Sequence, residues 1–248
     1  MARYYPPRFL FRRHEILRRV RSGRRFLEVG AGALRLARDL VGFFSSGVLL
    51  EPAPQAKQLW LSLPENIRER LDLQLTSLES FATSELFDCV ISCEVMEHVS
   101  DDLSFAQRLH ELLRPGGQLI LSVPAGMRYW SLGDRVAGHL RRYEKEGLTH
   151  LLSQAGFSDI QIIGYGFPFV NLLRIPSWLH ALMNRHVLEQ GDPAQLTRES
   201  GINLIAGLPS WLGLFVNPIT VWPFCRVAAL FNTFHLSDGF LVVAIKPG

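Results

Sequence analysis

Two acidic residues and two glycines near the N-terminus have the spacing of a binding site for a small ligand. The segment FLEVGAGALRLARDL (26–40) reads as a strand, a loop and a helix, with Glu28, Gly30 and Gly32 at the turn. Glycines let the backbone turn sharply and let a ligand approach its N–H groups, and a helix that follows points its positive end at the same place. Glu51 closes the next strand, nineteen residues after Gly32. The alternative for Glu51 is an acidic residue exposed at a strand end.

A second group of polar side chains lies in the segment YWSLGDRVAGHLRRYEKEGLTHLLSQAGF (129–157). His139 is a candidate base in this segment, because an imidazole can take a proton from a hydroxyl or an acidic carbon. Arg142 and Tyr143 can pair with a carboxylate or phosphate, since a guanidinium matches such oxyanions bidentately. Asp134, in the same segment, can pin the loop or cap a helix.

His98 is the other well-placed histidine, because it follows the strand expected at 87–93. It can act as a proton acceptor, or it can form a hydrogen bond at the start of the helix expected at 102–113. The other six histidines have no motif context, and we expect them to be structural or exposed.

The charge of the chain is unevenly distributed. Residues 1–25 contain nine arginines and one acidic residue, Glu15, whereas the remainder of the chain is mildly acidic. Such a basic arm can meet anionic lipid, nucleic acid or the carboxylate of a cofactor, or it can be a solvated arginine-rich helix face.

Short apolar runs alternate with longer amphipathic stretches through the first two-thirds of the chain, which is typical of βαβ units and a mostly parallel sheet. The predicted fold is therefore α/β. Strands are expected at 25–30, 47–52, 71–76, 87–93, 117–124, 159–166 and 239–247, and helices at roughly 34–43, 54–62, 102–113 and 144–154.

An insertion of about seventy residues precedes the last expected strand. We expect a core of residues 1–166 plus 238–248 and a helical cap at 167–237 that binds an acceptor. The charge-free stretch at 201–225 is long enough to cross a bilayer, but three prolines argue against one continuous spanning helix. We expect it to roof an apolar pocket, with Trp211, Phe215, Trp222 and Phe224 among the lining residues; docking on a membrane surface is the alternative.

Composition sets the broad class. The chain has 248 residues, of which 48% are hydrophobic and 20% charged, as in an ordinary globular protein with one large domain. Three cysteines without Cys-x-x-Cys spacing exclude a disulfide framework and argue against a structural zinc site. The N-terminus lacks the apolar core of a secretory signal. We therefore expect a cytoplasmic protein without a metal.

The glycine loop resembles that of class I S-adenosylmethionine-dependent methyltransferases, in which an acidic residue and one spacer precede Gly-x-Gly-x-Gly. The run from Glu28 to Gly32 matches, while Leu34 stands where the family usually has its third glycine. A dinucleotide fingerprint would instead need a glycine at Arg35, which argues against a nicotinamide-dependent oxidoreductase.

Two later segments strengthen the resemblance. FDCVISCEVMEHV (87–99) and LHELLRPGGQLILSVPA (109–125) are similar to ubiquinone-biosynthesis-like and related small-molecule methyltransferases, and a bacterial subgroup has a similar Gly-His-x-Arg-Arg-Tyr loop. The resemblance implies a Rossmann-like class I methyltransferase fold, with a seven-stranded, mostly parallel sheet, helices on both faces and a helical insertion before the last strand.

The resemblance also implies the site. The cofactor would be S-adenosylmethionine, converted to S-adenosylhomocysteine, with Arg13 closing over its carboxylate and Glu51 accepting both hydroxyls of its ribose. His139 and His98 would be catalytic. The cofactor-binding residues would be Arg13, Glu28, Gly30, Gly32, Glu51, Pro52, Ser77, Leu78 and Cys93. The acceptor would contact Trp130, Arg142, Tyr143, Trp211, Phe215, Trp222 and Phe224.

The expected reaction is methylation of a small, apolar or lipid-like acceptor, with O-methylation favoured over C-methylation. The alternatives are a membrane-surface methyltransferase of lipid-linked or glycan acceptors and an RNA methyltransferase. The chain lacks an Asn-Pro-Pro-Tyr-like tetrad and an added RNA-binding module, so no nucleic-acid partner is expected. A partner protein that merely keeps the fold is a non-enzymatic alternative. The oligomeric state and the methylated atom stay open.

Overall fold

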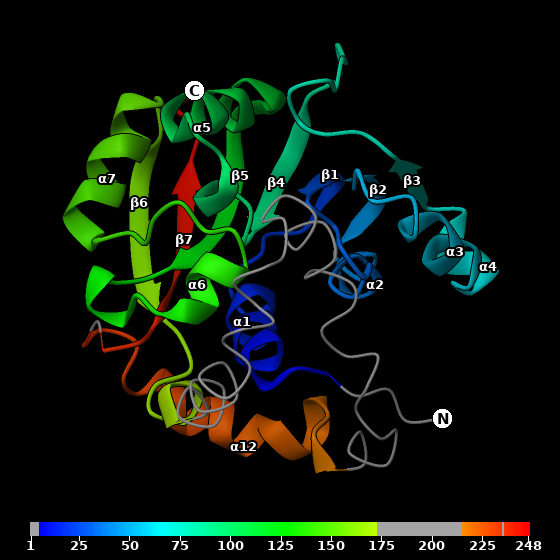
Figure 1. Cartoon of the computed structure of the whole chain (residues 1–248). Coiled ribbons are helices and arrows are strands. Elements are labelled where there is room, and N and C mark those ends of the chain that lie inside the picture. The colour runs from blue at the N-terminus through cyan, green and yellow to red at the C-terminus, as the bar shows by residue number, and fades with distance from the viewer. Residues whose placement is uncertain (1–4, 173–214, 235) are drawn as a thin grey trace. The chain divides into compact units, whose positions relative to one another are not determined.

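A computed structural model describes residues 5–172, 215–234 and 236–248. Its centre is a seven-stranded sheet in the order β3-β2-β1-β4-β5-β7-β6 (Figure 1). All seven expected strands are present. They are β1 (Gly23–Val29), β2 (Phe44–Leu50), β3 (Leu71–Gln74), β4 (Phe87–Cys93), β5 (Leu113–Pro124), β6 (Ser158–Gly164) and β7 (Gly239–Ile245).

The directions of the strands follow from their pairing. The pairs β1–β2, β1–β4, β2–β3 and β4–β5 are parallel. Strand β7 runs the other way, because Gly116 at the start of β5 donates to the carbonyl of Lys246, whereas Ala125 after its end donates to the carbonyl of Asp238. The sheet is therefore mixed, and its mostly parallel part matches the α/β expectation.

The helices agree with the sequence in most places. The expected helices at 54–62, 102–113 and 144–154 correspond to α3, α5 and α7, and a further helix, α1, precedes β1. The described elements are α1 (Pro7–Leu17), α2 (Ala37–Leu40), α3 (Ala56–Leu61), α4 (Glu65–Arg68), α5 (Asp102–Leu112), α6 (Leu132–Val136), α7 (Lys145–Gln154) and α12 (Pro218–Ala229), with single 3-10 turns η1 (Met96–His98) and η2 (Met127–Tyr129).

The helix expected at 34–43 is wrong in length. Only the four residues of α2 are helical, and consecutive turns occupy the chain before it. Leu34 has a positive φ of 55°, which a continuous right-handed helix does not allow. The glycine loop is consequently not followed directly by a helix N-terminus.

The chain divides into two compact units, each described by itself below. Unit 1 comprises residues 1–18, 124–144 and 163–241, and unit 2 comprises residues 19–123, 145–162 and 242–248. Strands β5, β6 and β7 contribute residues to both. The sequence pattern placed the boundary elsewhere, between a core and a cap at 167–237, and this division stays a prediction. Part of that cap lies outside the described residues.

Unit 2 contains most of the sheet. Phe26, Leu27, Val90 and Ile91, on β1 and β4, are fully buried. Helices α5 and α7 lie side by side in this unit (Figure 1). The last carbonyls of α5 are satisfied by Lys246, whose ammonium donates to the carbonyl of His110 at 3.0 Å and to that of Leu113 at 2.8 Å.

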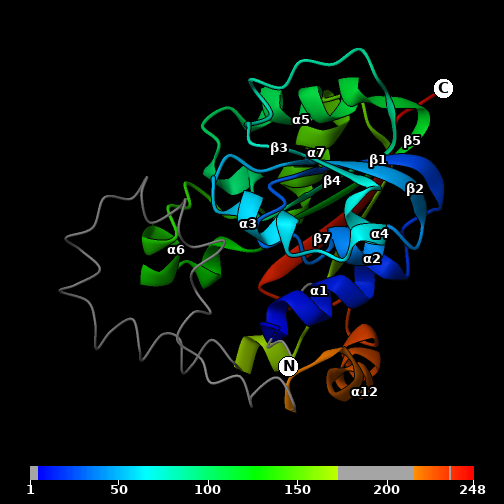
Figure 2. The same ribbon diagram turned by 90° about the vertical axis from the view of Figure 1, so that its right-hand side faces the viewer.

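Unit 1 contains the two helices from the ends of the chain. Helices α1 and α12 lie side by side in both views (Figures 1 and 2). Cys225 and Ala228 of α12 are buried, and the ring of Phe169 stacks on Phe11 of α1 and meets Phe224 of α12 edge-on. Among the described residues, no helix combines the length and the apolar character needed to cross a lipid bilayer.

The packing of β2 on β1 gives a test of the fold. A methyl group on Gly47 would overlap the ring of Phe26, which is fully buried, whereas one on Gly147 in α7 would meet no atom within 4 Å. We expect Gly47→Ala to lower the free energy of unfolding by about 1–3 kcal/mol. Gly147→Ala should raise it by about 0.5–1 kcal/mol, since alanine is the better helix former. Urea denaturation followed by circular dichroism measures both; equal effects of the two variants would contradict the packing.

Candidate functional site

The glycine loop of unit 2 has the strained backbone that the sequence predicts. Gly30 has a φ of 73°, and a Cβ there would overlap a methyl group of Val95. Gly32 has a φ of 50°. Leu34 adopts the same left-handed region although it has a side chain, and that side chain is almost fully buried. The position where the resemblance expects a third glycine thus keeps a glycine-like backbone, with a leucine packed into the interior.

Glu51 holds this loop in place. Its Oε2 accepts a hydrogen bond from the Gly32 N–H at 2.7 Å, and its Oε1 accepts one from the Ala53 N–H at 3.0 Å. The residue is only 9% exposed, which removes the alternative of an exposed strand-end acid. A carboxylate has about four acceptor positions, so two N–H donors leave room for two hydroxyls.

The other cofactor candidates of unit 2 follow the carboxyl ends of neighbouring strands. Glu28 is buried near the end of β1 and Cys93 is half-buried as the last residue of β4. Beyond β3, Ser77 is half-buried and Leu78 buried; Pro52, after β2, is exposed. Because β3, β2, β1 and β4 are adjacent and parallel, these residues share one edge of the sheet.

His98 closes the short turn η1 and is half-buried. Asp101 is the N-cap of α5, and its carboxylate accepts a hydrogen bond from the Ser104 N–H at 2.9 Å. The cap of α5 is thus Asp101, and the hydrogen bond considered for His98 at the start of this helix stays a prediction.

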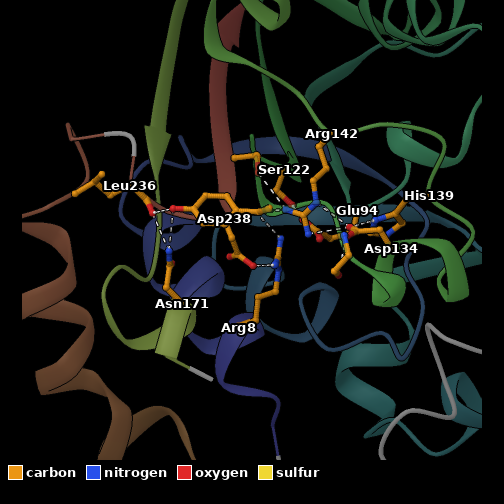
Figure 3. A network of polar contacts seen from close by, with 12 residues as sticks. Arg8, Glu94, Ser122, Asp134, His139, Arg142, Asn171, Leu236 and Asp238 are labelled. Carbon is orange, nitrogen blue, oxygen red and sulfur yellow. Dashed lines mark hydrogen bonds and ion pairs between the residues drawn. The ribbon is translucent and has the colours of Figure 1, made fainter. Parts of the chain in front are cut away.

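Unit 1 contains a buried network centred on Asp134 (Figure 3). Its Oδ1 faces His139 Nδ1 at 2.9 Å and accepts from Arg142 Nε at 2.8 Å, while its Oδ2 accepts from the backbone N–H and the hydroxyl of Ser131. Burial acts to raise the pKa of Asp134, but the His139 hydrogen bond, the Arg142 charge and the Ser131 hydroxyl together hold it well below its ordinary value. Asp134 is thus a carboxylate, and His139 Nδ1 is the donor.

Arg142 binds the chain's own atoms. Besides Asp134, its guanidinium donates to the carbonyls of Ala125 and Asp238 at 3.1 and 3.2 Å. Arg8 pairs with the Asp238 carboxylate at 2.9 Å (Figure 3). Arg142 therefore joins the segment after β5 to the segment before β7, a role the sequence interpretation did not include. Its contact with an acceptor stays a prediction.

The remaining acceptor candidates of unit 1 differ in exposure. Tyr143 is buried and its backbone bridges Pro124 and Gly126, whereas Trp130 is half-buried. Arg13, a candidate for the cofactor rather than for the acceptor, is half-buried on α1. Phe215, Trp222 and Phe224 are 67%, 55% and 50% exposed, and Trp211 lies outside the described residues.

Sequence reasoning missed Asp238 and Arg8. Their ion pair joins residues 230 positions apart, and neither stands in a local motif. Asp134 had a local signal, because Ser131 and Asp134 have the spacing of a capping box, and the structure forms that box at the start of α6.

The comparisons identify the class of the protein. Residues 1–162 match the family described as Methyltransferase domain, and the chain belongs to this family. The chain is also similar in fold to a solved methyltransferase structure from Bacillus halodurans, with a TM-score of 0.59, 15% identity and coverage of 95% of this chain and 99% of that one. A second similar structure is the N-methyltransferase NodS from Bradyrhizobium japonicum in complex with S-adenosyl-L-homocysteine. Its TM-score is 0.56 at 14% identity, and the match covers 96% of this chain and 86% of that one. These likenesses confirm the class I methyltransferase fold.

Curated relatives narrow the comparison. The chain is 27% identical over 160 residues to a ubiquinone biosynthesis O-methyltransferase from Ruegeria pomeroyi, covering 59% of this chain and 64% of that protein. It is 32% identical over 102 residues to the protein of the same name from Cereibacter sphaeroides, covering 41% of each. The matches thus span less than two-thirds of these relatives.

The Asp134 network predicts a pH dependence of stability. Because the folded-state pKa of Asp134 lies below its unfolded-state value, its stabilisation is present above about pH 4 and is lost as the pH falls below that value. We expect Asp134→Asn to lower the free energy of unfolding by about 3–5 kcal/mol at pH 7, since it leaves Arg142 buried without its counter-ion.

The advantage of the wild type over Asp134→Asn should shrink between pH 5 and pH 2.5. Urea titrations across this range measure it, with Glu79→Gln, an exposed acid, as the matched control. A difference that does not change with pH would mean that the carboxylate charge is not the stabilising element.

Proposed function

We propose that this protein transfers a methyl group from S-adenosylmethionine to a small, apolar or lipid-like acceptor, with an oxygen as the favoured methylated atom. The arrangement at Glu51 carries the proposal: a buried carboxylate that fixes the glycine loop and keeps acceptor positions for two ribose hydroxyls. Membership of the methyltransferase family and the names of the Ruegeria and Cereibacter relatives support the reaction and the oxygen acceptor.

The acidic side chains of unit 2 suit this cofactor. Glu28 is a buried acid near the end of β1, and an acid suits a ligand that carries an ammonium group. When bound, S-adenosylmethionine supplies an electrophilic methyl group on a sulfonium. Unit 2 would hold the cofactor by its ribose and its charged end. Correct positioning of the methyl group would then supply most of the acceleration of the reaction.

His139 is the proposed general base for a hydroxyl or acidic carbon. Its Nδ1–H donates to the Asp134 carboxylate, so in the neutral imidazole the lone pair is on Nε2. Asp134 thus fixes both the tautomer and the orientation of the ring, and stabilises the imidazolium that forms when Nε2 takes the proton. His98 is the second candidate for this role.

The proposal predicts the effect of removing the ribose acceptor. Glu51→Ala should weaken S-adenosylmethionine binding by about 1.5–3 kcal/mol, the usual size of a lost charge-assisted hydrogen bond. Calorimetry measures this, with Glu79→Ala as a control at an exposed acid of the same unit. Glu51→Gln, which keeps the side-chain volume, separates loss of the charge from collapse of the loop. Unchanged affinity in both Glu51 variants, or tighter binding of a nicotinamide cofactor by the wild type, would contradict the assignment.

The acceptor class is tested with methyl-labelled S-adenosylmethionine. Incubation with a lipid extract and with a polar extract should transfer label to the lipid fraction, and His139→Ala should lower turnover at least about a hundredfold while cofactor affinity stays the same. His150→Ala, at an exposed position on α7, is the matched control. Label confined to polar compounds would overturn the acceptor class, and full turnover by His139→Ala would overturn the role of the base.

A further inference from the structure

Unit 1 exposes an unusual amount of apolar surface. Fourteen large hydrophobic side chains are exposed among the described residues, and eleven of them belong to unit 1. Eight lie between residues 215 and 236, around α12. Large apolar patches are uncommon on the surface of soluble monomers and usually mark an interaction site. These eight residues are Phe215, Ile219, Trp222, Phe224, Val227, Leu230, Phe234 and Leu236.

Helix α12 buries only a narrow stripe. Cys225 and Ala228 are its buried residues. Ile219, Trp222, Arg226 and Leu230 follow one another at intervals of three or four residues, so they share another face of the helix. The three apolar members of this face are 83%, 55% and 73% exposed, and Arg226 is the only charged residue of the helix.

The charge of unit 1 is strongly positive. It contains thirteen Lys and Arg residues and seven Asp and Glu residues, a formal charge of +6, whereas unit 2 has a formal charge of −3. Helix α1, which packs against α12, contributes Arg12 and Arg13. The exposed apolar face and the basic side chains thus belong to the same compact unit.

We infer that the α12 surface docks on an anionic phospholipid membrane, with Ile219, Trp222 and Leu230 entering the boundary between headgroups and acyl chains. A basic unit with an apolar helix face combines the two attractions that hold peripheral proteins on membranes. Tryptophan suits this depth because its ring is apolar and its N–H is polar. The stem of Arg226 can lie along the apolar layer while its guanidinium reaches the phosphates.

Two other occupants fit the observations less well. A second copy of the chain would bring two units of charge +6 together, and like charges oppose such an interface. A pocket lined by Trp222 and Phe224 would bury these side chains, yet each is at least half exposed. The inference goes beyond the proposed reaction, since membrane docking needs no turnover.

Vesicle flotation tests the inference without an activity measurement. The full chain should float with vesicles of equal phosphatidylglycerol and phosphatidylcholine at 0.1 M NaCl, and at least about tenfold less with pure phosphatidylcholine vesicles or at 0.5 M NaCl. The double variant Ile219→Glu/Leu230→Glu should float at least about tenfold less than the wild type. Leu61→Glu, at a leucine of unit 2 that is 54% exposed, should change flotation less than twofold.

Each outcome decides the inference. Wild-type protein that stays at the bottom with anionic vesicles, or that floats equally on neutral ones, would overturn it, as would unchanged flotation of the double variant. A homodimer in sedimentation that the double variant dissociates, without vesicle binding, would assign the surface to a second copy instead. Circular dichroism of the same samples shows whether the variants are folded, and because it needs no cofactor it keeps this test separate from the proposed reaction.

Discussion

The buried carboxylate of Asp134 is the contact on which the organisation of unit 1 depends. It fixes the start of α6, orients His139 and compensates Arg142, whose guanidinium then satisfies carbonyls of two distant segments. The ion pair of Arg8 and Asp238 extends the same network to α1. An arginine so deeply buried needs a fully ionised partner, because an uncompensated charge away from water is very costly. The site geometry and the stability of the unit therefore rest on the same carboxylate.

Glu51 plays a comparable part in unit 2. Its two oxygens accept backbone N–H groups on either side, so the carboxylate first builds the loop and only then can hold a ligand. These two hydrogen bonds fix the loop before any ligand binds, and under the proposed function this lowers the entropy that binding must overcome. Leu34 adopts a backbone conformation that suits glycine better than leucine, and the burial of its side chain offsets the cost.

The sequence predicted the parts of the structure that depend on local pattern. The strands follow from short apolar runs, and Glu51 and the glycine loop follow from residue type and spacing. The helix at 34–43 was wrong, since tertiary packing of Leu34 overrode a local helical pattern. The partners of Arg142 could not be predicted, because Asp238 is 96 residues away and nothing near it signals a contact. Long-range polar pairing has no period in the sequence, whereas hydrophobic alternation does.

The charge that a binding partner meets is that of a folded unit, not that of a stretch of sequence. The arginine-rich first 25 residues are divided between the two units, and only residues up to Arg18 belong to unit 1. Unit 1 is nevertheless basic, because the segment around α6 and the loop after it adds four arginines and only two acids. The contact of α1 with α12 places the first part of the arm beside this apolar helix, which the sequence left open. The proposed lipid-like acceptor would partition into membranes, and an enzyme whose apolar helix and basic residues share one unit is suited to reach it there.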